Sequence, residues 1–197
     1  MTTLDTQHTA ATFFDAAPSI CAKCAQISPT CCHCSTGDDV LVAPLSADEW
    51  ERMQTVAPWV LAAGVVVRET NSPLFREEMI RLFPDQPEEV NASFPAGGHH
   101  LRLAQNHIGQ CACLGPAGCL LPTPARPLFC HLYPFWFFND RLQVFGDPHC
   151  LALRSLQTAE QLCAALHTTP DHLLATYHTL RLAWGVPQPD RSQAVDD

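Results

Sequence analysis

Cysteine is the residue type of this chain best suited to chemistry, since eleven cysteines occur among its 197 residues. Four of them, Cys111, Cys113, Cys119 and Cys130, lie in residues 110–134, a segment that is also rich in glycine and proline. These breakers exclude a long helix or a central strand, so we expect a loop. A loop with four thiols needs something to hold its backbone, and in a reducing compartment a bound metal is the expected clamp.

A second cysteine cluster lies roughly ninety residues upstream. Its members are Cys21, Cys24, Cys31, Cys32 and Cys34. The first two form a Cys-x-x-Cys pair, whose tight turn points both sulfurs to one side, as tetrahedral zinc or iron requires. A thioredoxin-like redox pair and a purely structural role are the alternatives, but the redox pair needs a βαβ context that is absent here. We expect the two clusters to meet in space.

An aromatic hairpin should stand beside these thiols. Residues 132–145 contain two aromatic and β-branched runs on either side of Asn139-Asp140, a pair that tolerates a left-handed turn. A hairpin returns its two ends to one place, so Cys150 is expected near Cys130 as a further ligand. Arg126, directly before a proline, is expected to donate to carbonyl groups or to offset thiolate charge.

Capping signals predict the helices around the site. One helix should run from Ser46, which opens a capping box with Glu49, to about Ala57. The others are expected from Pro73 to the residue before Pro84, from Thr158 to about His167, and from Pro170 to Trp184. Short strands are predicted within residues 39–45 and 100–104, and a surface loop over residues 85–98.

Together these elements predict a small single α+β domain, with short strands, one aromatic hairpin and about four helices around a cysteine-rich metal site. Residues 1–20 are expected to form a flexible lead-in, residues 21–186 the metal-binding domain and residues 187–197 a disordered tail. Cys163 falls on a predicted helix and is expected to be a buried core thiol.

Charge and hydropathy limit the partners. The formal net charge of −9 and the lack of a basic stripe argue against nucleic acid. No stretch approaches the roughly 20 apolar residues of a membrane span. The first twenty residues lack the features of a secretory or transit signal, so a cytoplasmic location is expected. The sequence predicts metal ions as partners and names no protein partner.

Several further residues have no role that the sequence assigns. The histidines near loops, His99, His100 and His107, could serve as ligands but are expected to be solvated. The remaining open cases are Cys34, Cys113, His33, His131 and His149.

The cysteine pattern resembles that of the YkgJ-like cysteine-cluster family of zinc- or iron-chelating domains. The segments Cys111-Ala-Cys-Leu114, Gly118-Cys119 and Arg126-Pro-Leu-Phe-Cys130 match the second half of that pattern in order. The first half departs from it, because six residues rather than two separate Cys24 from Cys31. His131 also stands where the family usually has arginine. The resemblance implies that the ligands are Cys21, Cys24, Cys31, Cys32, Cys111, Cys119 and Cys130, to which the hairpin argument adds Cys150.

The main functional hypothesis is therefore a metal-binding protein whose two cysteine clusters chelate zinc or iron, the latter including an iron–sulfur cluster. Eight thiolates exceed the four that one tetrahedral ion accepts, so two ions or a multi-iron cluster fit better. One alternative is a metal-dependent enzyme for methyl transfer or redox chemistry, since domains of this family are similar to part of flagellin lysine N-methylases. Another is a thiol-based redox sensor.

Overall fold

The computed structural model of the chain describes residues 20–27, 30, 32, 43–139, 141–146, 150–156 and 158–188. Within these residues, helices alternate with short antiparallel strands, which confirms the predicted α+β class. The helices are α1 (Ile20–Cys24), α2 (Ala47–Val56), α3 (Trp59–Ala63), α4 (Pro73–Leu82), α5 (Pro87–Ser93), η1 (Thr123–Ala125), α6 (Leu128–Leu132), α7 (Leu151–Ser155), α8 (Ala159–Ala165) and α9 (Pro170–Ala183). The strands are β1 (Pro44–Leu45), β2 (Val66–Thr70), β3 (His99–Leu103), β4 (Leu114–Gly115), β5 (Gly118–Cys119), β6 (Phe135–Phe138) and β7 (Arg141–Val144).

The predicted caps begin the longer helices. At α2, the Ser46 hydroxyl accepts from the Glu49 amide at 3.2 Å, and the Glu49 carboxyl accepts from the Ser46 amide at 2.9 Å, which completes the capping box. The Ser72 hydroxyl caps α4 by accepting from the Phe75 amide, and the Thr169 hydroxyl caps α9 by accepting from the His172 amide, each with a proline in the first turn. Local sequence therefore determines where these three helices begin.

The strands form three small antiparallel sheets. In the largest, the order is β1-β3-β2, and Val66 of β2 pairs with Leu103 of β3. β4 and β5, each two residues long, form a hairpin inside the cysteine-rich segment. The aromatic hairpin is β6–β7, in which Phe138 pairs with Arg141 and Asn139 takes the left-handed conformation (φ 49°), as the sequence predicts.

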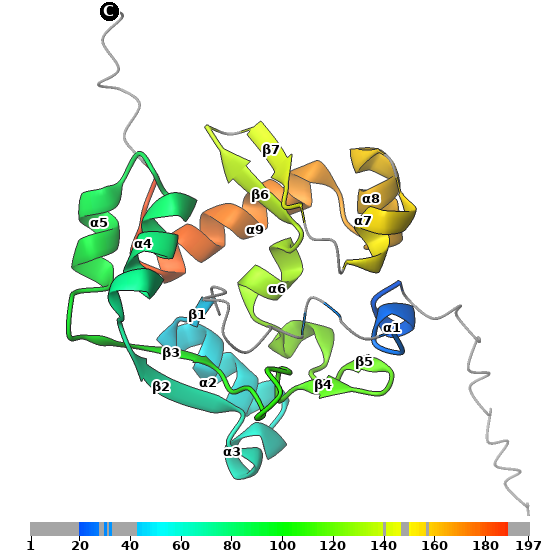
Figure 1. Cartoon of the computed structure of the whole chain (residues 1–197), viewed down its shortest axis with the longest axis horizontal. Coiled ribbons are helices and arrows are strands. Elements are labelled where there is room, and N and C mark those ends of the chain that lie inside the picture. The colour runs from blue at the N-terminus through cyan, green and yellow to red at the C-terminus, as the bar shows by residue number, and fades with distance from the viewer. Residues whose placement is uncertain are drawn as a thin grey trace, which may run out of the picture.

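Two apolar clusters support this framework. The major core gathers residues of α4, α5, α6, β6 and α7–α9 around Trp136, which is fully buried and donates its indole N–H to the Leu82 carbonyl at 3.1 Å. The minor core gathers Met53, Val60, Leu121 and neighbouring residues under the β1-β3-β2 sheet. In Figure 1, α6 lies between these two parts, with α9 on one side and α2 on the other.

Two expectations need correction or refinement. Residues 85–98 are not a plain loop, because α5 forms within them: Pro87 occupies the first turn, acidic side chains follow it, and Val90 is fully buried. The described residues also hold nine α-helices rather than about four. The additional helices, α1, α3, α5, α6 and α7, have five to seven residues each, too few for hydrophobic periodicity to reveal.

Among the described residues, no helix is both long and apolar enough to cross a membrane. The expected lead-in falls almost wholly, and the expected tail largely, outside the described residues, as do residues 39–42 of the first predicted strand.

Candidate functional site

The Cys-x-x-Cys pair lies on the short helix α1, which contacts β5 and the start of α7. Figure 1 shows α1 beside the β4–β5 hairpin. Gly118 lies at this contact: its φ is +103°, and a Cβ built on it would stand 3.6 Å from the Ala22 Cα, an ordinary contact distance. Because Gly118 directly precedes Cys119, the helix that carries Cys21 and Cys24 is packed against the hairpin that carries Cys119.

Cys32 provides a direct link between the two clusters. The amide of Cys111 donates a 2.8 Å hydrogen bond to the carbonyl of Cys32. Cys111 also forms an isolated antiparallel β-bridge with Gln105, which lies two residues after the end of β3. The clusters therefore meet in space, as the sequence predicts, at the edge of the minor core.

Two sulfurs of the second cluster accept hydrogen bonds from the backbone. The amide of Cys113 lies 3.4 Å from the sulfur of Cys111. The amide of Leu121 makes the corresponding bond to the sulfur of Cys119, again two residues along the chain. Such bonds stabilise negative charge on sulfur and orient it, as they do around metal-bound thiolates.

Cys111 and Cys113 form an unequal pair. The Cys113 side chain donates to the Cys111 sulfur, and together with the backbone bond this lowers the pKa of Cys111 to about 7. The same contact, reinforced by burial, raises the pKa of Cys113. Only 1% of Cys113 is exposed. The negative form of Cys111 is thus favoured and Cys113 is its thiol donor, a role that spacing alone does not reveal.

The other thiols influence one another through space. Burial raises the pKa of Cys130 well above its usual value, and the thiolates of Cys32, Cys111 and Cys119 raise it further. Yet Cys130 is exposed by surface area.

Cys21 lies on α1 and belongs to a second group of thiols, which includes Cys24 and Cys150. Burial raises its pKa first, followed by the charges of Cys32, Cys24 and Cys150. Cys150 is the buried N-cap residue of α7, and α7 contacts α1, so Cys150 stands on the α1 side. Cys32 thus raises the pKa of both Cys21 and Cys130, which places it between the thiols near α1 and the thiols near Cys130.

Arg126 acts as the sequence predicts. Its Nε donates to the Leu121 carbonyl at 3.1 Å. Its charge acts to lower the pKa values of Cys21 and Cys119, opposing the larger effect of burial, which raises both. Cys163 is a buried thiol of the major core, which confirms that expectation.

The histidines contribute less. His131 lies next to Cys130, but its Nε2 contacts the Thr123 carbonyl at 3.1 Å, and burial lowers its pKa. The expectation that His100 is solvated is wrong: it is buried, its Nδ1 lies 2.8 Å from the Asn71 side-chain oxygen, and its ring stacks on Phe75. Strand β3 carries it into the interior.

The donor set suits a thiophilic metal, because seven of the eight predicted ligands are described and the sulfur of cysteine is a soft ligand. Across the described ranges, however, no three histidine, cysteine, aspartate or glutamate side chains are grouped so that they could hold a metal ion. Cys31, Cys34, His33 and His149 lie outside those ranges. The ligand assignments therefore remain predictions.

Comparison with protein-family models, with curated proteins and with solved structures found no match to this chain.

Proposed function

We propose that the protein binds metal through thiolates drawn from both cysteine clusters, with zinc or iron, the latter including an iron–sulfur cluster, as the metal. The observation that carries this proposal is the link between the clusters. Two segments far apart in sequence are joined by the Cys111–Cys32 hydrogen bond, and α1 packs on the hairpin of Cys119. Thiols that lie this close together keep their protons, because the pKa values of several are raised, and a bound cation would favour their thiolate forms.

The backbone bonds to sulfur support the same proposal. Cys111 and Cys119 are oriented by amides two residues further along, and Arg126 offsets part of the local thiolate charge. The resemblance to the YkgJ-like family points to the same ligands. A bound zinc ion would supply a closed, structural centre, whereas an iron–sulfur cluster would supply electron-transfer chemistry.

The first experiment is metal and sulfide analysis, with an absorption spectrum, on protein purified without oxygen. Cys119→Ser and Cys130→Ser should each lower the bound metal by at least half, because each removes a thiolate ligand. Cys163→Ser is the matched control, since this thiol lies in the major core, and it should leave metal content unchanged. Equal metal loading in all three variants would refute the ligand assignment.

A thiol redox sensor is the second candidate, favoured by the pair of Cys111 and Cys113. A thiolate with a pKa of about 7 beside a thiol is suited to oxidation by a peroxide. The two thiols would lose two protons and two electrons to form one disulfide, and the peroxide would become water. Thiol counting separates the two functions: metal-bound thiols resist alkylation until a chelator is added, whereas sensor thiols react without one and disappear on peroxide treatment.

A further inference from the structure

A buried carboxyl group on α2 connects this helix to the segment that carries Cys130. Glu49 is only 1% exposed. Its Oε2 accepts from the Ser46 amide at 2.9 Å, which is the local capping bond. Its Oε1 accepts from the Leu128 amide at 2.7 Å, the first residue of α6, which is distant in sequence. The capping glutamate of one helix therefore also holds the start of another.

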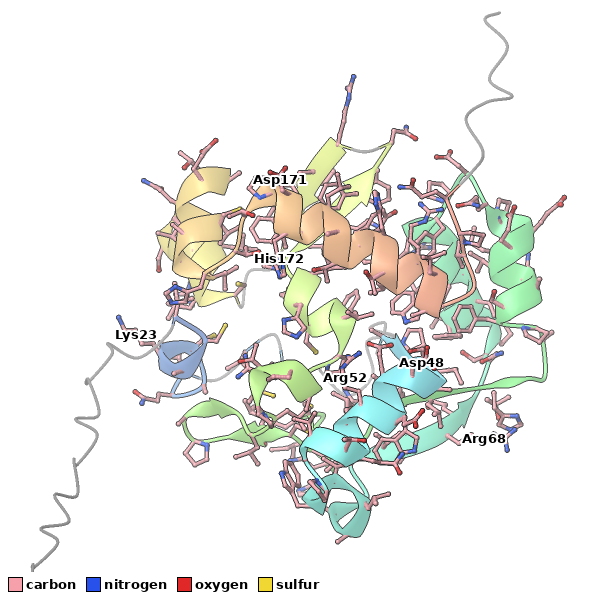
Figure 2. The ribbon with its side chains drawn as sticks, turned by 180° about the vertical axis from the view of Figure 1, so that it is seen from behind. Lys23, Asp48, Arg52, Arg68, Asp171 and His172 are labelled. Carbon is pink, nitrogen blue, oxygen red and sulfur yellow. The ribbon has the colours of Figure 1, made fainter. Side chains whose placement is uncertain are left out.

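Arg52 makes a second connection from the same helix to the same segment. Its Nε donates to the Pro124 carbonyl at 3.0 Å, and its Nη2 donates to the Arg126 carbonyl at 3.3 Å. Figure 2, where Arg52 is labelled, shows this side chain between α2 and the η1–α6 segment. Glu49 and Arg52 are three positions apart and so share one face of α2.

The two side chains fit the polarity of the segment. The carbonyl groups of Pro124 and Arg126 precede α6, and the amide of Leu128 begins it. From α2, Arg52 donates to these carbonyl groups and Glu49 accepts from this amide. Cys130 lies within the first turn of α6, close enough for the Glu49 charge to act on its thiol. The segment contains several prolines, which lack an amide donor, and the contacts from α2 add to the few hydrogen bonds that the segment makes within itself.

We propose that Glu49 and Arg52 are positioning residues: together they clamp residues 124–128 to α2 and so determine where Cys130 stands relative to the other thiols. The expected effect of the clamp on metal binding rests on the proposed function, but the clamp itself is a property of the metal-free fold. Glu49 and Arg52 touch the backbone of the segment, and they act on the site through Cys130.

The test compares Glu49→Gln with Ser46→Ala. Glutamine has one acceptor oxygen, so it cannot accept from both amides as the carboxyl group does, and the Leu128 or the Ser46 amide loses its partner. Ser46→Ala is the matched control, because it removes the other half of the capping box and weakens α2 while leaving the Glu49–Leu128 bond in place. Arg52→Gln removes both carbonyl contacts from a partly exposed position and serves if Glu49→Gln does not fold.

Two measurements are made on each variant. The first is the alkylation rate of Cys130 relative to Cys163 in reduced, chelator-treated protein, resolved by tandem mass spectrometry. Glu49→Gln and Arg52→Gln should raise this ratio about tenfold, the order expected for loss of a part-buried hydrogen bond to the backbone. The second is titration with Co²⁺, whose spectrum reports thiolate coordination. The same variants should weaken binding about ten- to hundredfold, as loss of an outer-shell partner does. Ser46→Ala should change neither measurement more than about twofold.

The outcomes separate the two proposals. If wild-type protein binds no metal, the proposed function fails, while the alkylation ratio still decides whether the clamp exists. If metal binds and Ser46→Ala has the same effects as Glu49→Gln, the contacts to residues 124–128 have no special role and the clamp is refuted. Unchanged alkylation of Cys130 in both Glu49→Gln and Arg52→Gln refutes it as well.

Discussion

At the scale of single residues, the contrast between Cys111 and Cys113 shows how context divides two neighbouring thiols. Cys113 donates its side-chain and backbone hydrogens to the Cys111 sulfur, so the negative form of Cys111 is favoured. Cys113 is buried and keeps its proton because deprotonation would place two negative sulfurs in contact. The chemical difference between them comes from hydrogen-bond direction.

This contrast predicts the pH dependence of alkylation in reduced, metal-free protein. Cys111 should react half-maximally near pH 7, well below the usual thiol pKa of 9.0. Cys113→Ala should move the profile towards that usual value, while Cys113→Ser, which keeps a donor, should move it less. Iodoacetamide kinetics at Cys111, followed by mass spectrometry, provide the measurement.

The same shift has a consequence for stability. The pKa is lower in the folded chain, so Cys111 favours the folded state fully above pH 9.0, and this contribution is lost as the pH falls through about 7. A Cys111 profile that is identical in wild-type protein and Cys113→Ala would contradict this account of the pair.

At the scale of elements, the packing of α1 on the β4–β5 hairpin depends on a backbone conformation that only glycine adopts easily. Gly118 has φ +103°, outside the range that residues with a Cβ favour. The space itself would tolerate a methyl group, since the nearest atoms of α1 lie 3.6–3.7 Å away. The constraint at this position therefore comes from the backbone.

Gly118→Ala should therefore destabilise the protein by about 1–3 kcal/mol, the cost of a strained backbone conformation. It should also lower metal content, because relief of the strain moves Cys119 or α1. Gly64→Ala is the matched control: its φ is +60°, no atom lies within 4 Å, and it follows α3, away from the thiols. It should lose stability without losing metal. Urea denaturation and metal analysis measure the two effects, and equal metal loss in both variants would contradict the prediction.

At the scale of the whole molecule, the thiols lie where the two apolar cores approach each other. Cys111, Cys113 and Cys119 pack in or against the minor core, whereas Cys150 belongs to the major core. α6, which carries Cys130, contacts α9 of the major core, and its start is bonded to α2. A metal that bound thiolates of both groups would tie the cores together.

Metal should accordingly stabilise the whole fold. At a free metal concentration of a hundred times the dissociation constant, the free energy of unfolding should rise by about 2.7 kcal/mol. Trp136 and Trp184 report on the major core and Trp50 on the minor one, so single-tryptophan variants can follow each core separately. Both midpoints should shift together, with the same shift in Cys163→Ser. A shift confined to one core would mean that the metal does not join them.

The sequence by itself determined the features that depend on neighbouring residues. Ser46, Ser72 and Thr169 begin helices because each cap involves a residue three positions away, and Asn139 turns the aromatic hairpin through similarly local contacts. The α+β class and the set of candidate thiols also follow from the sequence. The sequence does not predict α5, because Pro84, Pro87 and Pro95 in and around it indicate a loop and its seven residues are too few to display a period.

Only the tertiary structure decided which of these groups stand together. The approach of Cys111 to Cys32, the position of Cys150 beside α1 and the second bond of Glu49 all join segments far apart in the chain. The capping box predicted the partner of one Glu49 oxygen, which is the Ser46 amide. The partner of the other oxygen, the Leu128 amide, lies on α6. Such contacts depend on how the helices and loops pack around the two cores, and local capping or spacing carries no information about that packing.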